Sequence, residues 1–133
     1  MQTQMLSQER IHSKEELRAI LLVLQKEINT VSRDDVIAVS QVAEKAWVAF
    51  VTYVKVASAQ HIATHASVLE YTKQLIRKDK KLQQIYWNAN ALHFFHYAPF
   101  VEDVRGDLGT VLETIGSVLS SLKTRMKKLP NSY

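Results

Sequence analysis

The stretch "VIAVSQVAEKAWVAFVTYVKVA", residues 36–57, decides the fold class, because its apolar side chains recur at steps of three and four. Side chains at that spacing line one face of an α-helix. The run "SRDD" precedes it, with Ser32 as the expected N-terminal cap and acids in the first turn. We expect a helix to about residue 59 that buries one apolar stripe: Val36, Val39, Ala43, Ala46, Trp47, Phe50, Val54 and Ala57.

Four further segments show the same helical periodicity. The capping box "SKEE" begins at Ser13, Ser67 suits a later N-terminal cap, and Pro99 suits the first turn of a helix. Glycine and proline are too scarce for an architecture of short strands and turns. We therefore expect an all-α, up-and-down bundle of about five helices. The other four helices are expected at about residues 14–29, 67–77, 82–97 and 100–126.

The composition indicates one folded domain. A chain of 133 residues with 47% apolar and 23% charged residues can bury its own core. We expect residues 1–12 and 127–133 to be flexible tails. The chain has no cysteine, which excludes disulfides, thiolate catalysis, zinc fingers and iron–sulfur clusters, and no cofactor is expected. The sequence shows no secretory leader and no long apolar run, so we expect a cytoplasmic location and no membrane association.

The net charge of +4 is unevenly distributed. Basic clusters can neutralise phosphates, which makes them candidate contacts for nucleic acid. Lysines at the C-terminal end of a helix also complement the helix dipole, so a solvated helix end explains the same pattern. The two clusters are Lys73, Arg77, Lys78, Lys80 and Lys81, and then Lys123, Arg125, Lys127 and Lys128.

The stretch "NANALHFFHYAPF", residues 88–100, places His93 on the apolar face of the expected fourth helix. A buried histidine that forms a hydrogen bond with a neighbour accounts for this position. The functional alternative is a general base or a ligand donor, with Tyr97 as its expected partner one turn further on. Four histidines have helical spacings, but no carboxylate accompanies them in a metal-binding pattern, so no metal is expected. They are His61, His65, His93 and His96.

The aromatic side chains divide into two groups. Trp47, Phe50 and Tyr86 lie on apolar stripes, so we expect them in the core and not on a platform that stacks on bases. Tyr53 and Trp87 lie off the main stripes, and we expect them to be exposed or in a subunit interface.

Three segments resemble a known family: "AEKAWVAF" (residues 43–50), "HASVLEYTKQL" (65–75) and "NANALHFFHY" (88–97). Together with the long amphipathic helix that follows, they resemble the archaeal PaREP-type proteins of the HEPN superfamily (higher eukaryotes and prokaryotes nucleotide-binding). The resemblance covers about residues 14–122. Its strongest points are Glu44, Lys45, Trp47, His65, Asn90, Leu92, His93 and Tyr97.

The resemblance implies a small helical bundle, often a dimer, with His65, Asn90, His93 and Tyr97 as candidate binding residues. Some members of the superfamily are ribonucleases, and others are partners of minimal nucleotidyltransferases in toxin–antitoxin pairs. The ribonucleases have an arginine four to six residues before a histidine on one helix. That pattern is absent here, and the nearest arginine before His93 is Arg77.

We therefore expect a non-catalytic module that binds RNA or a nucleotide, or that is the partner of a nucleotidyltransferase. The alternative is a divergent, metal-independent ribonuclease that uses His93, with Tyr97 as a further candidate catalytic residue. The apolar Trp87 and the small residues Gly109 and Gly116 leave surface for a second subunit, which predicts a homodimer.

Overall fold

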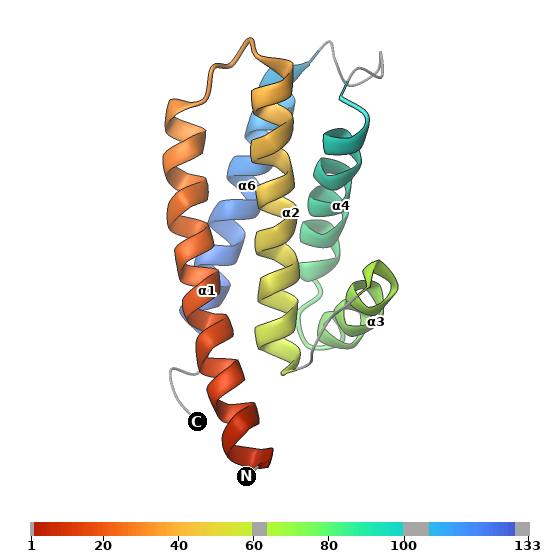
Figure 1. Cartoon of the computed structure of the whole chain (residues 1–133). Helices are drawn as coiled ribbons and strands as arrows, with labels where there is room; N and C mark the ends of the chain where they lie inside the picture. Colours follow the sequence, from red (N-terminus) through yellow and green to blue (C-terminus); the bar gives the residue numbers. More distant parts are fainter. Residues whose placement is uncertain (1, 60–63, 100–106, 130–133) are drawn as a thin grey trace.

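The computed structural model describes the backbone of residues 2–59, 64–99 and 107–129, and within these ranges the side chains from residue 14 onward. This part of the chain forms five helices and no strand, which confirms the expected all-α fold (Figure 1). None of the described helices is long and apolar enough to cross a membrane. The helices are α1 (Gln2–Thr30), α2 (Val36–Ser58), α3 (His65–Ile76), α4 (Leu82–Tyr97) and α6 (Leu108–Met126).

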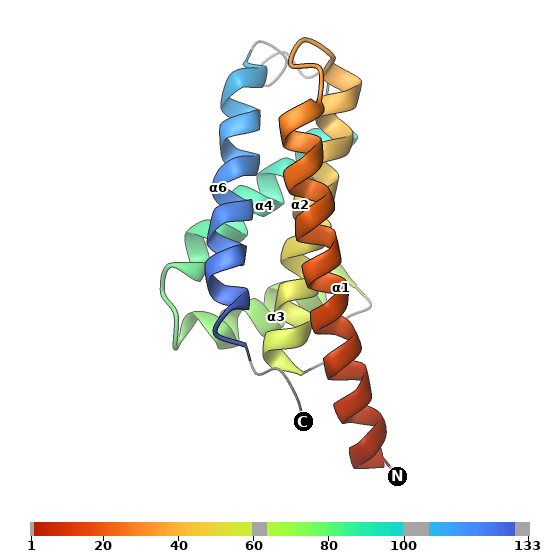
Figure 2. The same ribbon diagram turned by 90° about the vertical axis from the view of Figure 1, so that its left-hand side faces the viewer.

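The helix α2 is the centre of the bundle. It packs against α1, α3, α4 and α6, and α6 packs in addition against α1 and α4. The longer helices run side by side, whereas the short α3 lies at one end of the bundle, beside α2 and α4 (Figure 1 and Figure 2). Because α2 has neighbours on several sides, it buries far more than a single narrow stripe.

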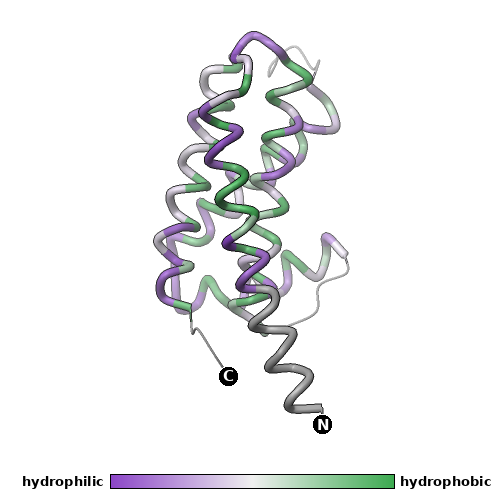
Figure 3. The backbone as a smooth tube through the Cα atoms, turned by 60° about the vertical axis from the view of Figure 1, so that its left-hand side comes forward, coloured by the Kyte–Doolittle hydropathy of each residue, from purple (hydrophilic) through white to green (hydrophobic). Residues whose placement is uncertain are grey.

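The core follows the apolar periodicity of the sequence. The expected stripe of α2 is confirmed, since its members from Val39 to Val54 are buried and its two ends are half-buried against the core. Hydrophobic residues recur along the coloured part of each helix (Figure 3), and most of the large apolar side chains are buried in the core. Burial of one such side chain contributes about 1.5–3 kcal/mol. The most deeply buried large apolar side chains are Leu17, Leu21, Leu24, Val39, Phe50, Val54, Leu82, Ile115, Val118 and Leu122.

The aromatic side chains largely take the expected places. Trp47, Phe50 and Tyr86 are in the core, and Trp87 is 57% exposed. The expectation for Tyr53 is wrong, because this side chain is only 8% exposed within the single chain. Its position lies off the main stripe, but α2 is packed by helices on several sides, so the side chain still meets neighbours. Burial raises the pKa of its hydroxyl group.

The first helix is longer than expected. It begins at Gln2 and not at about residue 14, so residues 2–12, which we expected to be a flexible tail, continue the helix. No glycine or proline interrupts this segment, and most of its residues have good helix propensity. At the other end of the chain, the carbonyl oxygen of Leu129 accepts a hydrogen bond from Lys14 Nζ at 2.6 Å, which ties the start of the expected C-terminal tail to α1.

The helix caps differ from the expected ones. Ser13, where we expected a capping box to start the first helix, lies inside α1. Asp35, and not Ser32, caps α2, because its carboxylate accepts the backbone N–H of Ala38 at 3.0 Å. Thr64 caps α3 in the same way, with the backbone N–H of Ser67 at 3.1 Å from its hydroxyl oxygen. Ser67, the expected cap, therefore lies in the first turn. Asp35 and Thr64 each lie three residues from the expected cap and also belong to the residue types that favour N-terminal caps, so the helices themselves are little changed.

The last helix begins later than expected. We expected it from about residue 100, but Asp107 has a non-helical backbone and caps α6 by accepting the N–H of Thr110 at 3.0 Å. Val101 and Val104, which we placed on the same helix, lie outside the described residues. A Cβ atom at Gly116 would meet nothing within 4 Å, so no described residue of this chain packs closely against this position.

Candidate functional sites

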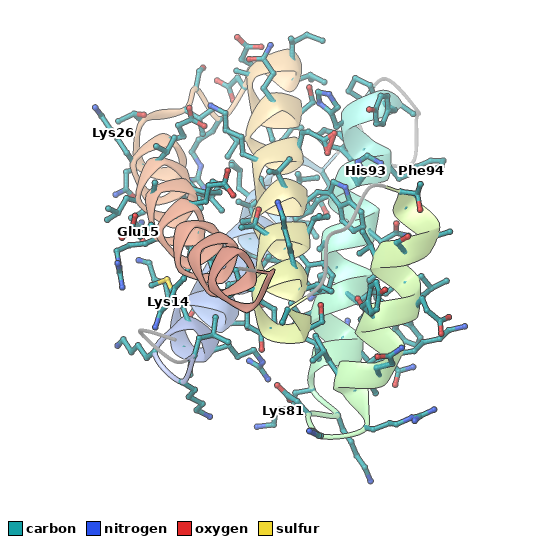
Figure 4. The ribbon with its side chains drawn as sticks, turned by 60° about the horizontal axis from the view of Figure 1, so that its bottom comes forward. Lys14, Glu15, Lys26, Lys81, His93 and Phe94 are labelled. Carbon is teal, nitrogen blue, oxygen red and sulfur yellow. The ribbon has the colours of Figure 1, made fainter. Side chains whose placement is uncertain are left out.

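Side chains from α2, α3 and α4 meet in a group that we call the histidine cluster. The residues are half-buried or exposed, except for Trp47, which forms the floor of the group. Figure 4 shows His93 on α4 beside the exposed Phe94. The histidine cluster consists of Glu44 and Trp47 of α2, His65 of α3, and His93, His96 and Tyr97 of α4.

His93 is held by a carboxylate. Its Nδ1 atom lies 2.7 Å from Oε1 and 3.2 Å from Oε2 of Glu44, so the ring donates its Nδ1–H to that side chain. The two side chains are 24% and 21% exposed. A carboxylate on Nδ1 fixes the orientation of the imidazole and leaves Nε2 as its other polar atom. The hydrogen-bonding partner of His93 is therefore Glu44 and not Tyr97, the partner that we expected from the sequence. Tyr97 instead packs edge-on against the ring at 5.0 Å.

Trp47 positions two of the imidazoles. Its ring stacks on His93 at a centroid distance of 4.8 Å and on His65 at 5.0 Å. The rings of His65 and His93 are themselves 5.6 Å apart. Phe50 and Tyr86 contact Trp47 on the core side. The apolar core thus supports the histidine cluster directly, and such aromatic contacts contribute about 0.5–1.5 kcal/mol each beyond the area they bury.

His96 completes the histidine cluster on the side of α2. Its Nδ1–H donates to the backbone carbonyl oxygen of Ser40 at 3.0 Å, and its Nε2 lies 4.0 Å from Glu44 Oε2. Tyr97 packs edge-on against this ring too, at 5.1 Å. The described residues contain no group of three or more potential metal ligands with suitable geometry. His61, which we considered with the other three histidines, lies outside the described residues.

The structure brings together three of the four predicted binding residues. His65, His93 and Tyr97 are in mutual contact through His93. Asn90 lies one turn before His93 on α4 and is half-buried. Reasoning from the residues did not predict the pairing of Glu44 with His93. The sequence feature that could have indicated this pairing is the position of Glu44 among the apolar residues of α2, since a carboxylate there requires a partner. The role of all these residues in binding stays a prediction.

The second candidate site lies where the turn between α3 and α4 meets the C-terminal end of α6 (Figure 2). The carboxylate of Asp79 accepts two hydrogen bonds from Arg125, at 2.7 Å from Nε and 3.0 Å from Nη2. This paired contact joins the two basic clusters of the sequence, which are 46 positions apart at these residues. We call the combined surface the basic end.

The ion pair that joins the clusters shifts the pKa values of both of its partners. The hydrogen bonds from Arg125 lower the pKa of Asp79 below its usual value, and Lys128 adds a weaker effect of the same sign. The pKa of Arg125 is raised by the same contact. Asp79, the acid within the first basic cluster, is therefore charged and neutralised by the second cluster.

Most other cations of the basic end point into solvent. Lys123 is the exception, since its Nζ donates to the side-chain oxygen of Gln25 at 2.6 Å. Figure 4 shows Lys81 extending away from the bundle at the start of α4. The exposed cations of the basic end are Lys73, Arg77, Lys78, Lys80, Lys81, Lys127 and Lys128.

Comparison of the chain with protein-family models, curated proteins and solved structures finds no match. The functional assignment therefore depends on the geometry of the histidine cluster and the basic end.

Proposed function

We propose that the chain is a non-catalytic, HEPN-like module that binds RNA through its basic end. One observation carries this proposal: Asp79 and Arg125 join two basic clusters that are far apart in the sequence. The acid that interrupts the first cluster is neutralised by that contact, so the exposed side chains around it form one cationic surface. A polyanion is the natural ligand of such a surface, because each neutralised phosphate releases bound counterions.

The HEPN-like assignment has independent support in the histidine cluster. The strongest points of the resemblance are scattered over three helices, yet Glu44, Trp47, His65, His93 and Tyr97 contact one another in the folded chain. Lys45, a further point, forms an ion pair with Glu27 of α1. A resemblance supports a family assignment more strongly when its matching residues contact one another in the fold than when they lie on unrelated surfaces.

The non-catalytic part of the proposal follows from the partners within the histidine cluster. Cleavage of RNA requires a group that moves a proton and a cation that stabilises the charge developing on the phosphate. Among the described residues, the ion-pair partners of Glu44 are His93 and His96, and no lysine or arginine joins them. The described cations of the basic end lie on α3, in the turn before α4, and in or just after the last turn of α6.

The test compares two double variants that lose the same charge. Lys80→Ala/Lys81→Ala removes two cations from the basic end, and Lys26→Ala/Arg33→Ala removes two exposed cations from α1 and the turn after it. Binding of a labelled single-stranded RNA is measured over a range of salt concentrations. We expect the first variant to bind more weakly across RNA sequences, with a salt slope smaller by roughly one to two. We expect the second to behave like the parent protein.

Two results contradict this proposal. The first is an absence of RNA binding by the parent protein at low salt. The second is equal weakening in the two variants, because that would assign binding to net charge and not to the basic end.

The pair of Glu44 and His93 favours a second candidate function, a metal-independent ribonuclease. A carboxylate that orients an imidazole through Nδ1 prepares Nε2 to accept a proton from a substrate hydroxyl. Incubation of RNA with the purified protein in the presence of a metal chelator tests this function. Under the leading proposal we expect no cleavage. Cleavage that is lost in His93→Ala, while the circular dichroism spectrum stays that of the parent, would replace the leading proposal with the ribonuclease.

A further inference from the structure

The outer face of α4 is apolar, exposed and free of charge. Its residues recur at helical spacing and are Gln84, Trp87, Ala91, Phe94 and Tyr97. Trp87 is 57% exposed, Phe94 is 67% exposed and Tyr97 is 73% exposed. The helix has 16 residues, and none of them is lysine, arginine, aspartate or glutamate. A solvent-facing helix normally has charged side chains on its outer face, so this face has the composition of an interface.

Other exposed apolar side chains of the described residues lie among charges. Leu22 of α1 is 66% exposed, but Arg18 and Lys26 stand one turn before and one turn after it. Val48 of α2 is 43% exposed and follows Lys45 by three residues. On the outer face of α4, by contrast, the residues one turn from Ala91 are aromatic on both sides. Large aromatic residues with no charge among them are typical of the centre of a protein interface.

We propose that a second copy of this chain covers the outer face of α4, with the two α4 helices antiparallel and a two-fold axis beside Ala91. In this arrangement Trp87 of each copy packs against Phe94 of the other. The pattern is self-complementary, because a small residue lies midway between two large aromatic ones. A two-fold interface requires that self-complementarity, since each copy presents the same surface to the other.

The charge distribution selects the second copy and the antiparallel direction. The net charge of +4 opposes association of identical chains wherever cations face each other. The outer face of α4 has no charge, so two copies meet there without repulsion. In an antiparallel pair, Lys80 and Lys81 of the two copies lie about 30 Å apart along the helices, well beyond a screening length of about 8 Å. A parallel pair would place these lysines side by side.

Ala91 allows the helices to approach closely. Packed helices are about 8–10 Å apart, and small side chains at the contact favour the lower value. With Cα atoms about 2.3 Å from each helix axis, two copies of residue 91 that face each other have Cα atoms about 3.4–5.4 Å apart. That range overlaps the Cα separation of about 4.4–6.8 Å that a disulfide requires.

The chain has no cysteine, so single cysteine variants test this geometry directly. Ala91→Cys is exposed to mild oxidation at tens of micromolar, and the products are separated without reductant. We expect most of the protein to run as a disulfide-linked dimer. An Ala91→Cys protein that stays monomeric under these conditions would overturn the proposal.

Two control variants make the result specific. Gln84→Cys lies on the same face, but in an antiparallel pair its two copies are about 21 Å apart along the helices, so we expect little cross-linking. Efficient linkage of Gln84→Cys would indicate parallel helices and contradict the proposed arrangement. Ser117→Cys lies on the exposed side of α6 and should remain monomeric. If it links as readily as Ala91→Cys, the linkage reflects random collision and the proposal fails.

Light scattering gives a readout that does not depend on disulfide chemistry. We expect the parent protein to be a dimer at tens of micromolar and Phe94→Glu to be a monomer with an unchanged circular dichroism spectrum. Because Phe94 is 67% exposed, we expect Phe94→Glu to stay folded, so a monomeric state of this variant would reflect the lost interface. A monomeric parent protein would assign the outer face of α4 to a different partner and overturn the proposal. None of these measurements involves RNA, so they are independent of the proposed function.

Discussion

The histidine cluster and the basic end differ in how their polar groups are used. In the histidine cluster, the carboxylate of Glu44 is bonded to His93, His96 is bonded to a backbone carbonyl, and the rings stack on a buried indole. At the basic end, one ion pair neutralises Asp79, and most of the remaining cations face solvent. The first group is engaged within the chain, and the second is available to a ligand.

The histidine cluster therefore concentrates reactive residue types, whereas the basic end is a surface that can bind a ligand. The stretch around His93 has the residues that enzymes use, but the fold employs them largely on one another. Substitutions in the histidine cluster should therefore act mainly on stability, and substitutions at the basic end mainly on RNA affinity. The predictions below follow that division, from the largest expected effect to the smallest.

Trp47→Ala should have the largest effect. The side chain is 6% exposed and stacks on both His65 and His93. Truncation of a buried tryptophan typically lowers the free energy of unfolding by about 3–5 kcal/mol. Urea denaturation measures that loss, and RNA titration of the variant at a temperature where it is folded should show unchanged affinity.

Trp87→Ala is the matched control for Trp47→Ala. The same truncation at this exposed position should change the free energy of unfolding by no more than about 0.5 kcal/mol, when measured at dilute concentration where copies do not associate. Similar losses in the two variants would contradict the view that the histidine cluster belongs to the core. A loss of RNA affinity in folded Trp47→Ala would move the binding site to the histidine cluster.

The sequence predicts the helices much better than it predicts the histidine cluster. Apolar spacing is a local property, and the buried row from Val39 to Val54 follows it closely. The caps were missed by a few residues because Ser32 and Asp35 are both good caps and local chemistry does not choose between them. The pairing of Glu44 with His93 joins residues 49 positions apart, and it depends on how α2 and α4 are rotated against each other. No periodicity specifies that rotation.

The position of the basic end can be predicted from the sequence more readily than the contacts within the histidine cluster. In an up-and-down bundle, alternating helices place the turn before the fourth helix and the end of the last helix at the same end of the molecule. The two basic clusters follow from this as neighbours. The helix order does not predict the contact of Asp79 with Arg125, because that contact requires the two side chains to meet at hydrogen-bonding distance.

Glu44→Gln should have a moderate effect on stability. The substitution keeps the shape but replaces a charge-assisted hydrogen bond to His93 with a neutral one. Hydrogen bonds to charged groups contribute about 1.5–3 kcal/mol and neutral ones about 0.5–1.5 kcal/mol, so we expect a loss of roughly 1 kcal/mol in urea denaturation. Glu113→Gln, on the exposed side of α6, should show no loss. A Glu44→Gln protein as stable as its parent would argue that Glu44 is retained for a ligand.

Asp79→Asn should have only a small effect on stability. The partners Arg125 and Asp79 are 14% and 35% exposed, so solvent weakens their attraction, and we expect a loss of at most about 1 kcal/mol at neutral pH. The folded-state pKa of Asp79 is lowered, so its contribution is present above the ordinary pKa of about 3.9 and is lost as the pH falls through the lowered value. Denaturation curves of parent and variant should therefore converge in acid. A difference that persists there would rule out this ion pair as the cause.

The same substitution should act on RNA binding with the opposite sign. Asp79→Asn removes the acid within the first basic cluster and releases Arg125, so the basic end gains positive charge while the fold loses stability. We expect tighter RNA binding with a steeper salt dependence. Asp34→Asn, an equal charge change in the turn before α2, is the control and should change neither property appreciably. If RNA affinity falls in Asp79→Asn, the ion pair acts by positioning the two clusters against each other. In that case the basic end is a shaped site, because a simple sum of exposed charges would bind more tightly.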